Sequence, residues 1–166
     1  MLGHTISRGI PLTIFSAGIS DLINEVVKQE TGIEPFCCQN IEVVAKQVHW
    51  RGIADDSLME SFEEPLVHGM NKHEIELPSR VRKQLRDPPR ILLLGDAMSD
   101  AKMAEAMIAG KDDAVVLKIA WIGDSFQQKE EADEKATGFL KAFDAIVYGD
   151  GPMDGVNSII YEAFTK

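Results

Sequence analysis

The sequence predicts an α/β protein with a mostly parallel sheet and flanking helices. Apolar runs such as Ile91–Leu94 contain no polar residue, which is typical of strands buried on both faces. Stretches with helical periodicity alternate with these runs, and that order favours βαβ units. The chain has 166 residues, of which 45% are hydrophobic and 27% charged, so we expect a single domain over residues 1–166 with one core.

The first half of the chain is expected to hold two strands, Pro11–Phe15 and Ile41–Ala45, because both runs are rich in β-branched or aromatic residues. Ser16-Ala17-Gly18 ends the first run. The helix Ile19–Glu30 follows, and its Gly-containing end is typical of a helix C-terminus. Its apolar residues share one helical face, which we expect to be buried: Leu22, Ile23, Val26 and Val27. The mixed polar segment Gln47–Glu64 predicts a hairpin outside the core sheet.

The second half is expected to alternate strictly between helices and strands. A short basic helix, Arg80–Arg86, lies between prolines. The strands that follow are apolar and short enough to cross a sheet: Ile91–Leu94, Ala114–Ile119 and Ala145–Tyr148. The helices between and after them show amphipathic spacing: Ser99–Ala109, Ser125–Phe143 and Gly155–Phe164.

Charge and cysteine content exclude several classes of protein. The net charge is −10 and no basic cluster stands out, so nucleic-acid binding through phosphate neutralisation is not expected. Cys37 and Cys38 are adjacent, and reduced thiols in a cytoplasmic protein are the simplest interpretation. No apolar run is long enough to span a bilayer, so we expect no membrane partner.

The segment after the third core strand carries two carboxylates, Asp96 and Asp100, behind Gly95. Ligand sites in open α/β sheets lie at the carboxyl ends of the strands. Paired carboxylates repel unless a cation holds them, and Mg²⁺ accepts one or two carboxylates together with phosphate oxygens. The pair therefore predicts metal-assisted chemistry on a phosphate, although acids at a helix N-terminus have the same pattern.

Two further residues precede that pair and suit an anion. Ser16 follows the first strand, where its hydroxyl and the backbone N–H groups of Ala17 and Gly18 can face a phosphate. The alternative is that Ser16 only caps the following helix. Lys72 lies in a polar loop and can neutralise a phosphate as a point charge, or can be a solvated surface lysine.

The order of these residues resembles that of a known family. A strand-end serine, a loop lysine and a strand followed by GDxxxD match the second, third and fourth motifs of the haloacid dehalogenase superfamily. The residues within the motifs resemble those of the cytosolic 5′-nucleotidase III family, the pyrimidine nucleotidases. The matching segments run through nearly the whole chain: Ile14–Ile19, Asn71-Lys72-His73, Ile91–Asp96 with Asp100 and Met103-Ala104, Leu117–Ile119 and Val156–Ile159.

The resemblance implies a Rossmann-like sheet and Mg²⁺-dependent hydrolysis of nucleoside 5′-monophosphates or other phosphate monoesters. It implies that Ser16, Ala17, Gly18 and Lys72 bind the phosphate, and that Lys72 also balances the charge of a phospho-aspartyl intermediate. Asp96 is implied as a direct Mg²⁺ ligand and Asp100 as a support for Asp96 or for the water shell of the metal. His73 receives no role.

The first motif of that family, DxDxT, does not occur in this sequence. Asp55-Asp56-Ser57 lacks its spacing, and Gly149–Asp154 repeats GDxxxD only in the last strand–helix turn. We therefore expect the first core strand of the family fold, which carries DxDxT, and the helical cap to be absent. We also expect the chain alone to have negligible phosphatase turnover. It is then a fragment of a nucleotidase, an inactive natural form, or one part of a site completed by another chain. The rival function is a catalytically inactive phosphate- or metal-binding interaction protein.

Overall fold

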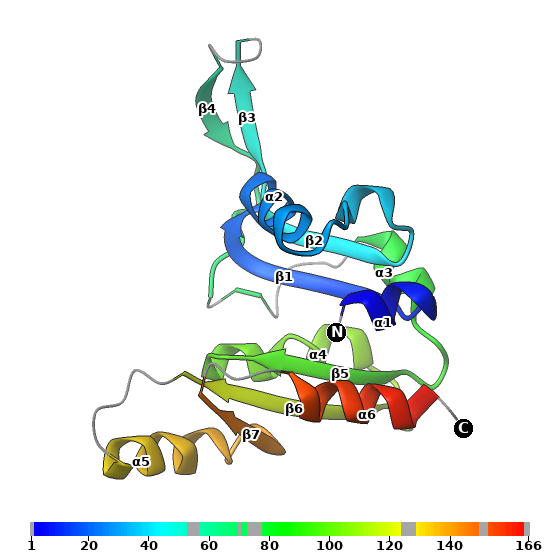
Figure 1. The fold of residues 1–166 in the computed structure, drawn as a ribbon, viewed down its shortest axis with the longest axis vertical. Coiled ribbons are helices and arrows are strands. Elements are labelled where there is room, and N and C mark those ends of the chain that lie inside the picture. Colours follow the sequence, from blue (N-terminus) through cyan, green and yellow to red (C-terminus); the bar gives the residue numbers. More distant parts are fainter. Residues whose placement is uncertain are drawn as a thin grey trace. The chain divides into compact units, whose positions relative to one another are not determined.

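We describe the fold from a computed structural model, which covers residues 2–52, 57–69, 71–72, 78–123, 129–149 and 153–164 (Figure 1). The chain folds into two compact units. The N-terminal unit contains residues 1–71 and 77–84, and the C-terminal unit contains residues 72–76 and 85–164. The expectation of a single domain over residues 1–166 stays a prediction.

The N-terminal unit is built on a parallel pair of strands, β1 (Leu12–Ile19) and β2 (Ile41–Lys46). Leu12 lies opposite Ile41, and pairing is regular as far as Phe15, after which it resumes only at Ile19. The residues between them form an irregularity at the carboxyl end of β1. The helical elements of this part are α1 (Leu2–Ser7), α2 (Ser20–Thr31) and the 3₁₀ turn η1 (Pro35–Cys37).

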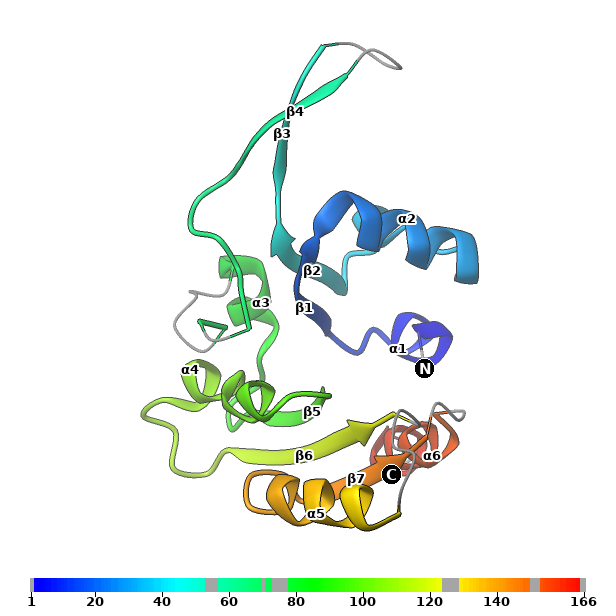
Figure 2. The ribbon, with the colours of Figure 1, turned by 90° about the vertical axis from the view of Figure 1, so that its left-hand side faces the viewer.

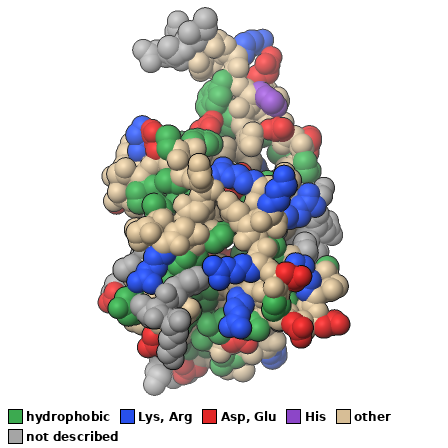
Figure 3. Space-filling view, turned by 90° about the vertical axis from the view of Figure 1, so that its right-hand side faces the viewer, with side chains coloured by type: hydrophobic (Ala, Val, Ile, Leu, Met, Phe, Trp, Pro, Cys, Tyr) green, Lys and Arg blue, Asp and Glu red, His purple; other side chains and the backbone are tan. Residues whose placement is uncertain are grey.

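An antiparallel hairpin, β3 (Val48–Arg51) and β4 (Leu58–Phe62), follows β2 directly. It extends away from β1, β2 and α2, as Figure 2 shows. Its surface carries exposed apolar side chains, and in Figure 3 hydrophobic and charged side chains lie together on it. The indole Nε1 of Trp50 donates to Asp21 Oδ2 at 2.8 Å, which fastens β3 to α2. The hairpin predicted within residues 47–64 is therefore confirmed.

The short helix α3 (Ser79–Gln84) completes the N-terminal unit and is held by polar side chains. Arg80 Nη2 donates to the Cys38 carbonyl at 2.7 Å, and Gln84 Nε2 donates to the Gln39 carbonyl at 2.8 Å. Arg80 also pairs with Glu42 on β2 at 3.2 Å. These contacts attach α3 to the turn that leads into β2.

The C-terminal unit is a parallel three-stranded sheet in the order β5–β6–β7. Its strands are β5 (Arg90–Gly95), β6 (Val115–Ile122) and β7 (Ala145–Tyr148). The helical elements are η3 (Met98–Lys102), α4 (Glu105–Ile108), α5 (Lys129–Phe139) and α6 (Asp154–Phe164). Alternating strands and helices thus give the parallel pairing that the sequence predicted.

The core of this unit is apolar and continuous. It joins the sheet to α5, whose Phe139 stacks on Phe143 with ring centroids 5.5 Å apart. Its buried members are Leu93, Ala101, Ala104, Ala120, Ile122, Ala136, Phe139 and Phe143. The small Ala101 allows η3 to pack against β5.

Three predictions of local structure are wrong: the end of the first strand, the buried face of α2 and the helix over residues 99–109. Ser16-Ala17-Gly18 does not end the first strand, because β1 continues to Ile19. The apolar face expected on α2 is only partly covered: Leu22 and Val26 are 63% and 59% exposed. The single helix expected over 99–109 is instead η3 and α4, separated by Met103 and Ala104.

The other elements agree with the sequence to within a few residues. The last strand, Ala145–Tyr148, has the predicted bounds. Residues 125–128 of the predicted helix 125–143 lie outside the described residues, and its described part ends at Phe139. Within the described residues, no helix is both long and apolar enough to cross a membrane.

Candidate functional site

The carboxylate of Asp100 is the centre of a polar cluster at the carboxyl end of β5. Asp100 is the third residue of η3, and its side chain is only 4% exposed. Its Oδ2 accepts the backbone N–H groups of Asp96 and Ala97, each at 3.2 Å. These bonds satisfy amides at the start of η3 and fix the turn that follows the strand.

The second oxygen of Asp100 is held by Lys72. Lys72 Nζ lies 2.8 Å from Asp100 Oδ1, and the lysine side chain is 12% exposed. A buried ammonium needs a charged partner, because removing either ion from water without compensation is costly. The loop lysine is therefore placed beside the strand end by the second aspartate of the GDxxxD segment.

Glycine at position 95 is required by the same turn. A Cβ built on Gly95 would lie 2.5 Å from Asp100 Cβ and 2.9 Å from Asp100 Oδ2. Real Cβ atoms do not approach so closely, so any side chain at 95 would push the aspartate away. The spacing Gly95–Asp100 thus has a steric reason: the strand ends where the carboxylate folds back onto it.

The first aspartate has a different environment from the second. Asp96 is exposed, and no hydrogen bond or ion pair to its carboxylate is found among the described residues. Its backbone N–H is held by Asp100, which fixes the main chain from which the side chain projects. Asp96 therefore presents an available carboxylate at the end of a parallel strand, where α/β proteins bind ligands.

Ser16 lies inside β1, in the irregularity near its carboxyl end. Its Oγ accepts the N–H of Gly18 at 3.1 Å. The N-cap residue of α2 is Ile19, with no side-chain cap, so the alternative that Ser16 caps this helix is wrong. Ala17 is half-buried and Gly18 exposed. The hydroxyl is thus used locally, to shape a turn of small residues.

The donor set around Asp96 can be compared with the needs of Mg²⁺. The ion favours oxygen ligands and often takes one or two carboxylates, with water and phosphate oxygens completing its shell. Asp96 supplies one free carboxylate, whereas both oxygens of Asp100 are already bound by N–H groups. No cluster of three or more His, Cys, Asp or Glu side chains in the described ranges is placed to hold a metal. The described residues fit an ion held by one carboxylate, that of Asp96, with other groups completing its shell.

All six predicted site residues are described, and Lys72 and Asp100 are in direct contact through their side chains. Sequence reasoning placed Lys72 and Asp100 in one site but missed that they bind each other. The sequence contains a signal for this ion pair. Asp96 and Asp100 repel each other unless a cation is near, and Lys72 is a cation in a loop earlier in the chain. His73, Asp55 and Asp56 lie outside the described residues, as do positions 150–152 of the repeated GDxxxD segment.

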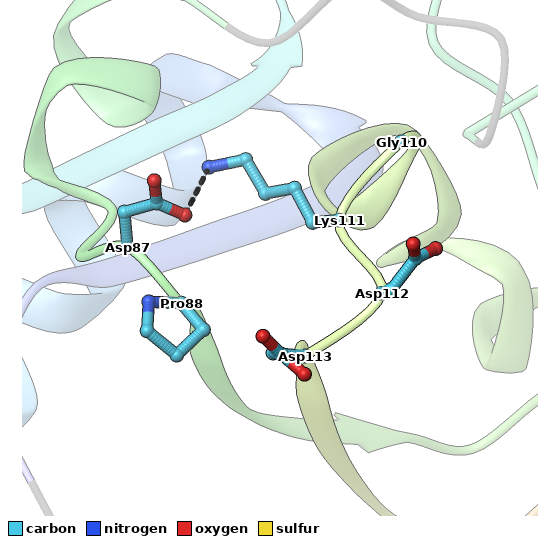
Figure 4. Close-up of a pocket in the computed structure, with 6 residues that line it drawn as sticks. All are labelled: Asp87, Pro88, Gly110, Lys111, Asp112 and Asp113. Atoms are coloured by element: carbon cyan, nitrogen blue, oxygen red, sulfur yellow. Dashed lines mark ion pairs between the residues drawn. The ribbon is translucent and has the colours of Figure 1, made fainter.

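A surface pocket occurs at the opposite, amino-terminal end of β5 and β6. Asp87 and Pro88 precede β5, and residues 110–113 precede β6 (Figure 4). Lys111 Nζ and Asp87 Oδ1 are 3.7 Å apart, and the side chains of Asp112 and Asp113 are exposed nearby. The pocket is acidic and lies away from the cluster around Asp100, so it does not contribute to the candidate site.

Comparison with known proteins decides the family. The family model described as Pyrimidine 5'-nucleotidase (UMPH-1) matches residues 1–163. The chain belongs to this family. The resemblance read from the motifs around Ser16, Lys72 and Asp96 is thereby confirmed over nearly the whole sequence.

Curated relatives in this nucleotidase family are longer than the chain. The 7-methylguanosine phosphate-specific 5'-nucleotidase of Gallus gallus is 30% identical over 152 residues, which are 91% of this chain and 47% of the relative. The Homo sapiens protein of the same description is 28% identical over 154 residues, covering 92% and 46%. The chain therefore spans about half the length of the curated relatives that it matches.

A solved structure supports the fold of this family member. The crystal structure of cytosolic 5'-nucleotidase IIIB bound to cytidine aligns with a TM-score of 0.74 at 24% identity. The alignment covers 96% of this chain and 49% of the solved one. At this identity the match establishes the α/β fold with parallel sheets and helices.

Proposed function

We propose that this chain is the phosphate- and metal-binding part of a Mg²⁺-dependent 5′-nucleotidase that acts on nucleoside 5′-monophosphates in the cytosol. Family membership supports the reaction class, and the names of the relatives support a nucleotide substrate. The observation that carries the proposal is the pairing of Lys72 with Asp100 beside the free carboxylate of Asp96.

Each residue of the cluster has a separate task in this proposal. Lys72 has three N–H donors, and the one bound by Asp100 leaves others for phosphate oxygens. Asp100 holds the lysine and the turn in place, and Asp96 would hold Mg²⁺. When bound, Mg²⁺ supplies positive charge that stabilises charge developing on the phosphate oxygens.

The attacking group is not assigned to this chain. The sequence has no DxDxT motif, and Ser16 Oγ already accepts the Gly18 N–H. A serine hydroxyl also needs a neighbouring base to become a nucleophile, and the motif offers none. We therefore propose that the chain alone binds nucleotide without turning it over.

Binding is tested by calorimetry of the whole chain with CMP, UMP and 7-methyl-GMP in the presence of Mg²⁺. Loss of a hydrogen bond to a charged group costs about 1.5–3 kcal/mol, so Lys72→Ala should weaken binding roughly 10- to 150-fold. Lys102→Ala is the matched control, because Lys102 is exposed in η3. Asp96→Asn should abolish the part of the affinity that depends on Mg²⁺.

Turnover is tested by phosphate release with the same nucleotides. Release at the level of the blank, with binding that needs Lys72 and Asp96, supports the proposal. Release well above the blank by the chain alone contradicts it.

The phosphate role that the resemblance gives Ser16, Ala17 and Gly18 is tested separately with Ser16→Ala. A catalytically inactive phosphate- or metal-binding protein is the second candidate function, and the cluster of Lys72 and Asp96 favours it because these groups can bind a ligand without a nucleophile. Restoration of turnover by a polypeptide that carries a DxDxT strand would exclude this second candidate.

A further inference from the structure

Cys37 and Cys38 form a pair of free thiols that the proposed function does not use. They lie at the end of η1, with Cys37 exposed and Cys38 half-buried. Adjacent cysteines give two sulfur donors on neighbouring residues, and both residues are accessible to solvent. Such a pair can bind a centre that takes two thiols at once.

The backbone that carries the two thiols is fixed by hydrogen bonds on both sides. The Cys38 N–H donates to the Pro35 carbonyl at 3.0 Å, which closes the 3₁₀ turn. The Cys38 carbonyl accepts Arg80 Nη2 at 2.7 Å. A site on an anchored turn loses less conformational freedom when a ligand binds than a site on a mobile loop.

A direct disulfide between the two residues is disfavoured by their separation. Neighbouring Cα atoms across a trans peptide are about 3.8 Å apart. Disulfides usually join Cα atoms about 4.4–6.8 Å apart. Placing a third atom between the sulfurs enlarges the ring and removes this constraint, so the pair suits a bridging atom better than an S–S bond.

The charge around Cys37 keeps it as a thiol. Cys37 Sγ donates to Glu34 Oε2 at 3.4 Å, and this carboxylate raises the pKa of the thiol above its ordinary value. Partial burial of the Cys37 sulfur and the neighbouring Cys38 raise this pKa further. A reagent that requires a preformed thiolate is therefore disfavoured here.

We propose that Cys37 and Cys38 form a dithiol site for trivalent arsenicals of the type R–As=O. Two As–S bonds form and the As=O bond is lost, and the two thiol protons leave with the oxygen as water. The oxidation state of arsenic and of both sulfurs is unchanged, so the step needs no oxidant. The organic group keeps the third position on arsenic, so two soft sulfur ligands complete the site.

The test uses phenylarsine oxide and the whole chain. Intact mass should show one adduct per chain at the mass of the reagent minus one water. The two thiols, counted with a chromogenic disulfide in denaturant at alkaline pH so that both ionise, should both be lost after treatment. A dithiol such as 2,3-dimercaptopropanol should reverse the adduct, whereas an equal excess of a monothiol should not.

Single substitutions separate chelation from simple thiol binding. Cys37→Ser and Cys38→Ser each leave one sulfur, so each should weaken binding by about 10²- to 10⁴-fold, as expected when a linked second contact is removed. Glu34→Gln is the matched control, because it alters the same turn but keeps both thiols, and it should retain the adduct. In a Trp121→Phe background, the fluorescence of Trp50, in the same unit, reports whether each variant is folded.

Two results would overturn the inference. The first is wild-type affinity in either cysteine variant while the protein is folded. The second is an adduct that a monothiol removes from the wild-type chain as readily as a dithiol does. This site is independent of the proposed nucleotidase activity, so failure of either proposal leaves the other standing.

Discussion

The two units of the chain are stabilised in different ways. The C-terminal unit has a continuous apolar core in which Phe139 and Phe143 pack against the three-stranded sheet. The N-terminal unit has a two-stranded sheet, and none of the eight residues of β1 is fully buried. It is joined instead by side chains such as Asn40 and Arg80 that bind backbone carbonyls. Where few apolar residues can be covered, directional polar contacts must fix the arrangement.

The two tryptophans allow this comparison to be measured. Trp50 belongs to the N-terminal unit and Trp121 to the C-terminal unit. In a Trp50→Phe background, the fluorescence of Trp121 follows unfolding of the C-terminal unit. A Trp121→Phe background does the same for the N-terminal unit.

The largest effect is expected in the apolar core. Phe139 is 5% exposed, and Phe139→Ala should destabilise the C-terminal unit by about 3–5 kcal/mol through lost burial and a residual cavity. Urea unfolding followed by Trp121 measures the change. The adjacent Leu140 is 58% exposed, and Leu140→Ala should change stability by less than about 0.5 kcal/mol. Equal losses in the two variants would show that this core does not carry the unit.

The second effect concerns the ion pair of the candidate site. Asp100→Asn leaves Lys72 buried without a carboxylate, which should cost about 3 kcal/mol. Trp121 fluorescence in urea again measures it. In the N-terminal unit, Arg51 and Glu60 are 3.7 Å apart and largely exposed. Glu60→Gln should therefore change stability by at most about 1 kcal/mol, and a loss as large as that of Asp100→Asn would contradict the role of burial.

The smallest of the three effects tests the polar contacts of the N-terminal unit. Asn40 Nδ2 donates to the carbonyls of Thr5 and Ile10, at 2.9 and 2.8 Å. Asn40→Ala should cost about 2 kcal/mol, as expected for two hydrogen bonds. Trp50 fluorescence measures it, and Gln39→Ala is the control because its backbone carbonyl, which accepts from Gln84, is kept. An unchanged midpoint for Asn40→Ala would show that these bonds do not stabilise the unit.

The sequence predicted the fold well where periodicity and breakers agree. Uninterrupted apolar runs located β5 and β7, and the mixed polar segment after Ala45 located the hairpin. It failed where a long-range contact overrides local preference. The helix expected from Ser99 is a 3₁₀ turn, in which the Asp100 side chain binds backbone amides beside Gly95.

Prediction of the site was limited in the same way. Motif order selected Ser16, Lys72, Asp96 and Asp100 as candidates, whose roles stay predictions, and the family is confirmed. Spacing alone gave the two aspartates the same task, because it contains no information about which carboxylate is buried. The distinction between a held Asp100 and a free Asp96 depends on Lys72, which lies far away in the sequence.

The contact between Lys72 and Asp100 also has a consequence for how the chain folds. It closes a loop of 28 residues, which must lose conformational freedom before the ammonium meets its carboxylate. The segment between the two residues includes α3 and β5. Formation of these elements reduces the length of flexible chain that must be closed, so the ion pair forms most easily after them. We therefore expect the Lys72 side chain to be among the last groups placed during folding, after β5 and the turn that carries Asp100.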